Sequence, residues 1–435
     1  MSDDFEYSGP TIQWTLAGDD ETQQEENLDQ VEESFGFDHA QQLVADTVAR
    51  LAPTTVLDFT SRMVQQRAQV DGIWHKLPPM DRESGDLMLA TLKQMAGLNV
   101  KERRQRQEGS FTALIRKTKY KVRLVSQGVK TGERVAVYLD WKQPTVETLD
   151  ELGMRPSAFE QLGEVLRSPD LGMILVTARP GEGFTTAWRG VMNACDRLVR
   201  DFYVIEDAAN VEPEIINVKS ITFDGEAGED AMTPIPKLLL KEPDVLAFTD
   251  LPDGKMIDNV MNLSNDHELP IFTRIPGKGA VDATLRMMVM KPDRQKFTKI
   301  LTGVVCMRLI RKLCEKCRIG YKPHPSLLQK LGLPPNRIAM LYKPFVFRPG
   351  MVDEDENEIE RCEHCCGLGY RGRTGLVEFL KINDEFRQAM ISNPKLETLS
   401  AIAAKHGHIS LKQEGLVLVA KGTTSLEELQ RVLKA

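Results

Sequence analysis

The chain has no long apolar run and no basic or apolar start. Its hydrophobic stretches are shorter than the roughly 20 residues that a membrane-spanning helix needs. Its first residues, MSDDFEYSG, lack the basic and apolar parts of a secretory signal. The sequence therefore predicts a cytoplasmic protein. Cysteine is also scarce: seven among 435 residues, most of them late in the chain, fit a reduced compartment and a metal site better than a disulfide framework.

Positive charge is missing from the first forty residues. They hold twelve Asp or Glu residues and no Lys or Arg, so they contribute −12 to a total of −7 and leave the remainder at +5. This composition predicts a flexible acidic arm over residues 1–40, with at most a short amphipathic piece near Val31–Phe37. Two roles stay open for the arm: a solubilising tail, or a tether that docks on a basic or membrane-associated partner.

The rest of the chain has the pattern of two α/β domains. Helical and strand-like periodicity predicts a first α/β domain over residues 41–143. In residues 144–435 the apolar runs LGMILVT, DFYVIED, VLAFTD and LPIFTR alternate with helical segments. Strands connected in this way favour a parallel sheet covered by helices on both faces. The last stretch, from Pro394, is predicted to be helical.

One segment, LGMILVTARPGEGFTT, has the strand, glycine loop and hydroxyl-bearing helix start of a phosphate-binding loop. Such a loop cradles phosphates with backbone N–H groups, neutralises them with a lysine and holds magnesium with a hydroxyl. Gly183 and Thr185 fit the spacing, but Ala178 replaces the first glycine and Phe184 replaces the lysine. The segment therefore has the glycine loop and the hydroxyl of a phosphate-binding loop, but it lacks the positively charged lysine.

Two C-x-x-C pairs, Cys314 with Cys317 and Cys362 with Cys365, lie late in the chain. Four thiolates with this spacing close a tetrahedral zinc site, which can stabilise a small subdomain that lacks its own core. We therefore predict a structural zinc ion in a tetracysteine subdomain over residues 306–380; the alternative is four unrelated reduced cysteines. Nucleic-acid binding is not expected, because the chain is acidic overall and lacks aromatic residues interleaved with basic ones.

Neighbouring residues leave details of this metal site open. Cys366 is an alternative ligand to Cys365, and His364 is a weaker one. Arg308 and Arg311 lie beside the first cysteine pair, where they either stabilise the thiolates or form a solvated helix face.

Several strings together resemble the cytoplasmic hexameric ATPases of type II secretion and type IV pilus assembly. The first domain carries VDGIWHKLPP, MAGLNVKERRQRQEG and VRLVSQGVKTGERVAVYLD; the second carries IEDAANVEP, KEPDVLAFTDLPD, LTGVVCMRLIRKLCEKC and CEHCCGLGYRGRTGLVEF. The likeness runs from about residue 41 to the C-terminus. It implies an N-terminal α/β domain followed by a P-loop NTPase (RecA-like) domain with a parallel sheet, a zinc-ribbon subdomain and C-terminal helices.

The resemblance also implies a nucleotide site, from which this chain departs at several positions. The family carries a lysine at the position of Phe184, a catalytic glutamate at that of Asp250 and a histidine at that of Pro276. Arg179 and Arg189 are candidate substitute cations. The positions that the resemblance implies as nucleotide-binding are Gly181, Gly183, Thr185, Thr186, Glu206, Asp207, Arg123 and Arg134, the last two facing the nucleotide of a neighbouring subunit. Glu206 and Asp207 either hold magnesium through water or are ordinary strand-end carboxylates that cap a helix.

Two functions follow from the resemblance. The first is a ring subunit, hexameric by resemblance, with impaired or absent ATP hydrolysis, which acts as a scaffold or regulator with an inner-membrane platform protein of a secretion or pilus system. The second is an active ATPase that binds ATP and magnesium and drives pseudopilus or pilus assembly. In both cases the expected location is the cytoplasm, peripheral at the inner membrane through partners.

Overall fold

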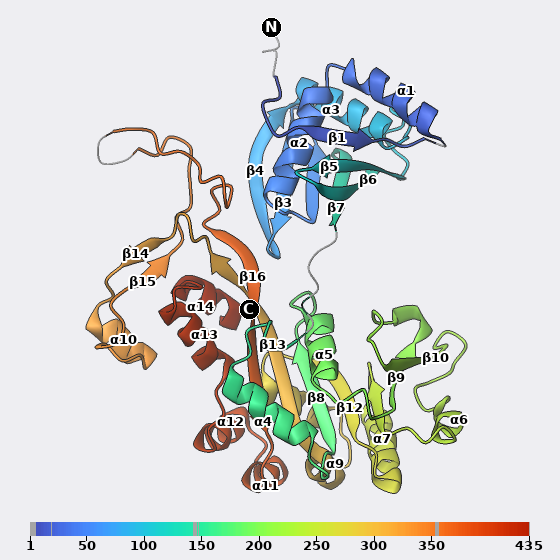
Figure 1. Ribbon diagram of the computed structural model, residues 1–435, viewed down its shortest axis with the longest axis vertical. Coiled ribbons are helices and arrows are strands. Elements are labelled where there is room, and N and C mark those ends of the chain that lie inside the picture. The colour runs from blue at the N-terminus through green and yellow to red at the C-terminus, as the bar shows by residue number, and fades with distance from the viewer. Residues whose placement is uncertain (1–5, 19, 142–145, 147, 353–355, 435) are drawn as a thin grey trace. The chain divides into compact units, whose positions relative to one another are not determined.

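The computed structural model describes residues 6–18, 20–141, 146, 148–352 and 356–434. These residues form two compact units (Figure 1). The first contains residues 6–141 and the short segment 359–367, and the second contains the other described residues from 146 onward.

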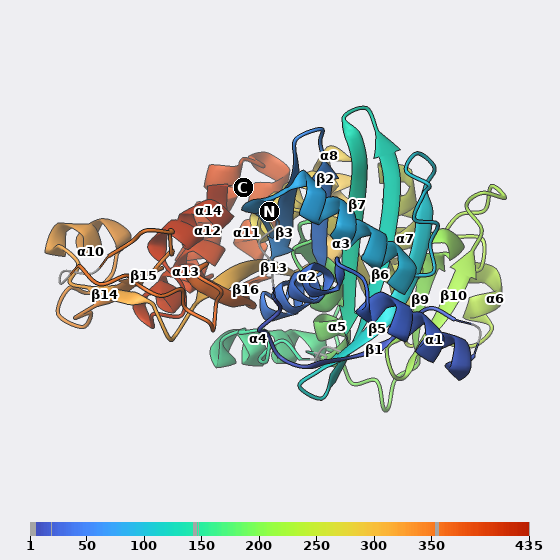
Figure 2. The ribbon, with the colours of Figure 1, turned by 90° about the horizontal axis from the view of Figure 1, so that it is seen from above.

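The first unit is built on a seven-stranded antiparallel sheet with the order β1-β5-β6-β7-β2-β3-β4. Its elements are β1 (Ile12–Thr15), α1 (Glu21–Glu32), α2 (Phe37–Ala49), β2 (Thr54–Phe59), β3 (Met63–Val70), β4 (Ile73–Asp81), α3 (Arg82–Met95), β5 (Gln107–Ile115), β6 (Thr118–Val129) and β7 (Gly132–Trp141). Figure 2 shows α2 and α3 on one face of the sheet. Leu43 of α2 and Leu92 of α3 are buried there against alternate strand residues such as Val122 and Val137. The period-2 pattern of the strands thus gives this sheet one covered face.

The acidic N-terminal segment belongs to this unit. Strand β1 pairs with β5, and Asp20 caps α1 by accepting a hydrogen bond from the backbone N–H of Gln23 at 2.8 Å. Ile12, Leu16 and Val31 are buried in the core of the unit. The structure therefore differs, over residues 6–18 and 20–40, from the flexible arm expected for residues 1–40. A few well-spaced apolar side chains order the segment despite its charge.

The second unit is built on a seven-stranded sheet with the order β10-β9-β11-β12-β8-β13-β16. The strands are β8 (Met173–Ala178), β9 (Phe202–Asp207), β10 (Val218–Phe223), β11 (Val245–Phe248), β12 (Ile271–Pro276), β13 (Leu301–Leu313) and β16 (Tyr370–Lys381). Among these strands every neighbouring pair is parallel except β13 with β16. The four apolar runs that predicted parallel strands are β8, β9, β11 and β12, so the predicted α/β fold class is confirmed.

Helices cover both faces of this second sheet (Figure 1). On one face, α4 (Pro156–Leu166) and α5 (Phe184–Asn193) enclose a core that includes Ile174 and Val176 of β8. On the other face, a larger core includes Leu175 of the same strand. The helices on that side are α6 (Ile235–Leu239), α7 (Gly254–His267), α8 (Ala280–Val289), α9 (Arg294–Ile300), α11 (Asp384–Ser392), α12 (Leu396–Lys405), α13 (Leu411–Ala420) and α14 (Leu426–Lys434). Alternate residues of β8 therefore enter different cores, as expected for a strand buried on both faces.

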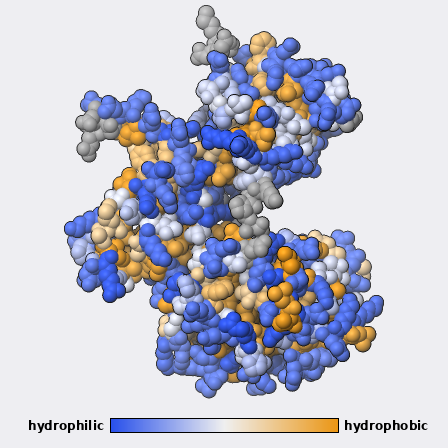
Figure 3. Space-filling view, in the orientation of Figure 1, coloured by the Kyte–Doolittle hydropathy of each residue, from blue (hydrophilic) through white to orange (hydrophobic). Residues whose placement is uncertain are grey.

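A small lobe follows β13. It consists of β14 (Ile319–Tyr321), α10 (Pro325–Leu331) and β15 (Leu341–Lys343), with β14 and β15 antiparallel. Figure 3 shows that hydrophilic residues cover most of the visible face, with hydrophobic residues in small groups. Among the helices of the described residues, none combines the length and the apolar content that crossing a bilayer requires.

Candidate functional site

The predicted nucleotide residues of the second unit gather at one edge of its sheet. Parallel pairing sets Ala178 of β8 opposite Pro276 of β12, and Phe248 of β11 opposite Ile205 of β9. The loops after these four strands therefore leave the sheet at the same edge, which is where open α/β sheets bind ligands. This edge carries Gly181, Gly183, Thr185, Thr186, Glu206, Asp207 and Asp250.

Two glycines shape the loop between β8 and α5, where the sequence predicts a phosphate-binding loop. Gly181 and Gly183 have positive φ angles of 75° and 87°, which residues with a Cβ rarely adopt. A Cβ on Gly183 would also lie 2.3 Å from Cε of Met307. Helix α5 begins directly after this glycine without a side-chain cap, with Thr185 exposed and Thr186 half-buried. The uncapped N–H groups of the first turn are a favourable place for an anion.

The side chain that stands in place of the lysine is covered by an arginine. The guanidinium carbon of Arg274, on β12, lies 5.0 Å from the centre of the Phe184 ring and 5.7 Å from that of Trp188. Its Nε donates to the carbonyl oxygen of Thr249 at 2.9 Å. Its Nη1 lies 2.6 Å from Oε1 of Glu212, close enough for an ion pair although not aligned as a hydrogen bond. The positive charge beside Phe184 is therefore neutralised within the protein.

The predicted acidic residues lie in three different environments. Glu206, near the end of β9, is buried and accepts a hydrogen bond from the Ser220 hydroxyl at 3.1 Å; burial raises its pKa above the ordinary value. Asp207 accepts a hydrogen bond from the backbone N–H of Ala209 at 2.9 Å, and so caps a short 3-10 turn. Asp250, after β11, is exposed. Glu206 and Asp207 are therefore both engaged by hydrogen bonds within the protein, and their role toward magnesium stays a prediction.

Arg123 and Arg134 lie in the first unit, on β6 and β7. The Arg123 guanidinium carbon is 4.1 Å from the centre of the Tyr138 ring, and its Nη1 is 3.0 Å from Oε1 of Glu108. Nε of Arg134 is 2.5 Å from Oδ1 of Asp58. The two arginine side chains are 37% and 50% exposed, so they pair with acids of their own unit and stay accessible to solvent. Their role beside the nucleotide of a neighbouring subunit stays a prediction.

The cysteines predicted as metal ligands form one cluster. It consists of Cys314, Cys317, Cys362 and Cys365, whose sulfur atoms all lie within 4.8 Å of one another. Zinc–sulfur bonds of about 2.3 Å in a tetrahedron place the sulfurs about 3.8 Å apart, so this donor set can hold a metal ion after a small contraction. Cys366, which has a positive φ of 50°, is outside the cluster.

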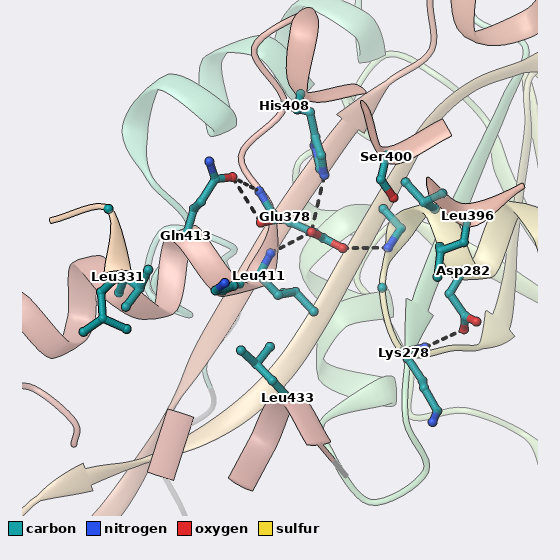
Figure 4. Close-up of a pocket in the computed structure, with 18 of the residues that line it drawn as sticks. Lys278, Asp282, Leu331, Glu378, Leu396, Ser400, His408, Leu411, Gln413 and Leu433 are labelled. Atoms are coloured by element: carbon teal, nitrogen blue, oxygen red, sulfur yellow. Dashed lines mark hydrogen bonds and ion pairs between the residues drawn. The ribbon is translucent and has the colours of Figure 1, made fainter. Parts of the chain in front are cut away.

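A cavity of about 770 Å³ in the second unit was not predicted (Figure 4). At its wall Glu378 of β16 accepts hydrogen bonds from the backbone N–H of Ala280 at 2.6 Å and of Leu411 at 2.8 Å. One buried carboxylate thus caps the first turns of both α8 and α13. Nε2 of His408 lies 3.4 Å from the same carboxylate; burial lowers the pKa of His408, but the contacts with Glu378 outweigh it and raise the pKa. Since these polar groups satisfy one another, we assign them to the fold.

Comparison with known proteins identifies the family. A model of the type II/IV secretion system protein family matches residues 30–431. The chain belongs to this family. It is 26% identical over 402 residues to the type IV pilus assembly ATPase PilB of Thermus thermophilus, which covers 92% of this chain and 43% of that protein. It is 26% identical over 392 residues to the type II secretion system protein E of Dickeya dadantii, covering 90% of this chain and 74% of that protein. The resemblance seen in the sequence is confirmed.

Other comparisons agree with this membership of the secretion family. The chain is 27% identical over 370 residues to the protein transport protein HofB homolog of Escherichia coli, covering 84% of this chain and 75% of that protein. Among solved structures it is similar to the ATPase DotB of Legionella pneumophila, with a TM-score of 0.52 and 12% identity over 92% of this chain and 94% of that chain. At that identity the likeness shows a shared fold. The chain spans less than half of the Thermus protein, at 43%.

Proposed function

We propose that this protein is a ring subunit of a secretion or pilus assembly system with impaired or absent ATP hydrolysis, acting as a scaffold or regulator. The observation that carries the proposal is the arrangement of Phe184, Arg274 and Glu212 at the sheet edge. Phe184 supplies no charge to a phosphate, and Arg274 is already paired with Glu212. A triphosphate at this loop would lose the lysine's charge-assisted contact, which contributes about 1.5–3 kcal/mol.

Two other departures support the same proposal. Asp250, at the position of the family's catalytic glutamate, is one methylene shorter, which withdraws the carboxylate by about 1 Å; a misplacement of that size can slow a reaction about a hundredfold. Pro276, at the position of the family's histidine, ends β12 and has no side-chain donor for a phosphate oxygen. Three separate elements of the site thus lack the side chain that the family carries there. This supports the proposal that the site no longer hydrolyses ATP.

The second candidate is a working ATPase that drives pilus or pseudopilus assembly. The positive φ of Gly183 and the exposed Thr185 favour it, because the cradle and the magnesium-binding hydroxyl persist. We expect purified protein with ATP and magnesium to release phosphate at the background rate, and Asp250→Ala to change nothing. Steady phosphate release that Asp250→Ala abolishes would establish the working ATPase in its place.

Calorimetry tests the missing cation directly. We expect Phe184→Lys to raise the affinity for Mg–ATP at least about tenfold, because a lysine at this position restores a charge-assisted contact. The control is Phe184→Leu, which removes the aromatic ring without adding charge, and which should leave binding weak. If Phe184→Lys and Phe184→Leu raise the affinity equally, the bulk of the ring and not the missing charge limits binding.

The remaining assignments in this proposal rest on family membership. We infer a ring, hexameric as in the family, in which Arg123 and Arg134 face the motor domain of a neighbouring subunit. We infer zinc as the ion of the cysteine cluster, with ATP and magnesium as the nucleotide-site ligands if any are bound. The inferred partner is the platform protein of an inner membrane, which would hold the ring at the cytoplasmic face.

A further inference from the structure

Glu182, the residue between the two glycines of the phosphate-binding loop, forms a bidentate ion pair with Arg308 of β13. Arg308 Nε donates to Oε2 of Glu182, and Nη2 donates to Oε1 at 3.2 Å. The Arg308 side chain is 1% exposed and that of Glu182 is 25% exposed. A carboxylate of the loop itself therefore binds a buried cation.

The path of β13 explains how the loop reaches this arginine. β13 pairs with β8 as far as Met307 and Ala178, and then continues past the end of β8 to Leu313, still paired with β16 on its other side. The loop that follows β8 runs beside this extension. Gly183 packs on Met307, whose side chain belongs to the core under α5. Glu182 reaches Arg308, the next residue of the strand, which points to the opposite face.

Arg308 is also bound to the C-terminal helix. Its Nη2 donates to the carbonyl oxygen of Val432, in the last turn of α14, at 2.7 Å. The carbonyl groups of a last helical turn have no partner within the helix, and a cation beside them is favourable. One buried guanidinium thus joins the phosphate-binding loop on one side to the end of α14 on the other.

We propose that Glu182 and Arg308 form a latch that couples the phosphate-binding loop to α14. Arg308 is buried and depends on Glu182 for its countercharge, so loss of that carboxylate leaves a buried unpaired cation. The guanidinium then turns toward water and gives up its bond to Val432. A change of the loop is in this way transmitted through Arg308 to the C-terminal helix. Glu182 and Arg308 act as positioning residues.

Amide hydrogen exchange of the full chain, followed by mass spectrometry, tests the latch. In Glu182→Gln we expect exchange to rise about tenfold in both the loop at residues 179–183 and the last turn of α14, a factor that corresponds to about 1.4 kcal/mol. Helix α7 serves as the internal reference and should not change. The matched control is Glu226→Gln, which neutralises an exposed acid of the second unit and should leave both segments unchanged.

A second variant guards against a general loss of structure. Arg308→Lys keeps the charge but replaces the planar fork with a single ammonium group, which cannot hold Glu182 bidentately and reach Val432 as well. It should raise exchange in the same two segments. If Glu182→Gln loosens the loop while α14 is unchanged, or loosens neither, the coupling is refuted. The result is independent of hydrolysis: an active enzyme would overturn the proposed function and leave the latch intact.

Discussion

The double substitution Cys314→Ser and Cys365→Ser is expected to abolish metal binding. We expect zinc, measured by mass spectrometry of the purified protein, to fall from about one ion per chain to background, because a closed structural site needs four ligands. Binding at such sites contributes about 10–16 kcal/mol to folding. The lobe formed by β14, α10 and β15 follows Cys317 directly and buries few side chains, mainly Leu328 and Leu341. Without the ion this lobe should unfold and become cleavable by trypsin.

Cys195→Ser is the matched control for the metal site. Cys195 follows α5, is half-buried and lies outside the cluster, so its replacement should preserve both the zinc content and the resistance to trypsin. Background zinc content in the wild-type protein would show that the clustered thiols are ordinary reduced cysteines, and full zinc content in the double variant would show that the ion binds elsewhere. Zinc loss without new cleavage sites would show that packing against the core of the second unit holds the lobe without the ion.

Glu428→Gln is expected to lower the free energy of unfolding at pH 7 by about 3 kcal/mol, the cost of leaving a buried charge without its partner. The Glu428 side chain is fully buried in α14, where Oε2 lies 2.8 Å from Nη2 of Arg311 and Oε1 lies 2.7 Å from Nη2 of Arg431. Burial raises the pKa of Glu428, but the two arginines outweigh it and lower the pKa to about 2, from an ordinary value of 4.5. The carboxylate therefore stabilises the fold at neutral pH.

The pH dependence of this effect has a defined sign. A group whose pKa is lower in the folded state stabilises fully above its unfolded pKa, and the contribution is lost as the pH falls through the folded pKa. The difference between wild type and Glu428→Gln in urea unfolding should thus be full above pH 4.5 and shrink toward pH 2. Glu427→Gln, at the exposed neighbouring position, should show almost no difference at any pH. A constant difference between pH 7 and pH 3 would contradict the role of the ionised pair.

Local patterns predicted much of the second unit and the cysteine cluster. The runs that form β8, β9, β11 and β12 are each recognisable as a strand from a few consecutive apolar residues. The spacing of the two cysteine pairs predicts a metal site, and the four cysteines do form one cluster. Family membership then followed from several short strings together. None of these inferences needed a contact between distant residues.

Contacts between distant residues were what the sequence could not supply. Arg179 and Arg189, close to Phe184 in sequence, were the expected substitute cations, yet Arg274 of β12 covers the ring. The available signal was an arginine two residues before Pro276, in the segment where the family carries its histidine. Arg308 was expected to stabilise thiolates or to lie on a solvated helix; it belongs to strand β13, is 1% exposed and binds Glu182. In both cases the order of the strands in the sheet determines which side chains the arginine contacts.

Strand β1 reduces the number of unpaired backbone groups through which the sheet of the first unit could aggregate. If β1 were missing, β5 would present a nine-residue row of unpaired backbone groups at the border of the sheet. With β1 in place, the four residues Thr112–Ile115 of β5 are paired, and the strongly acidic helix α1 lies next to β1. A shorter unpaired row beside charges of one sign resists strand-to-strand aggregation. The acidic start of the chain thus favours solubility as an ordered part of the fold. Its removal would leave that whole side of β5 with unpaired backbone groups, which favour aggregation.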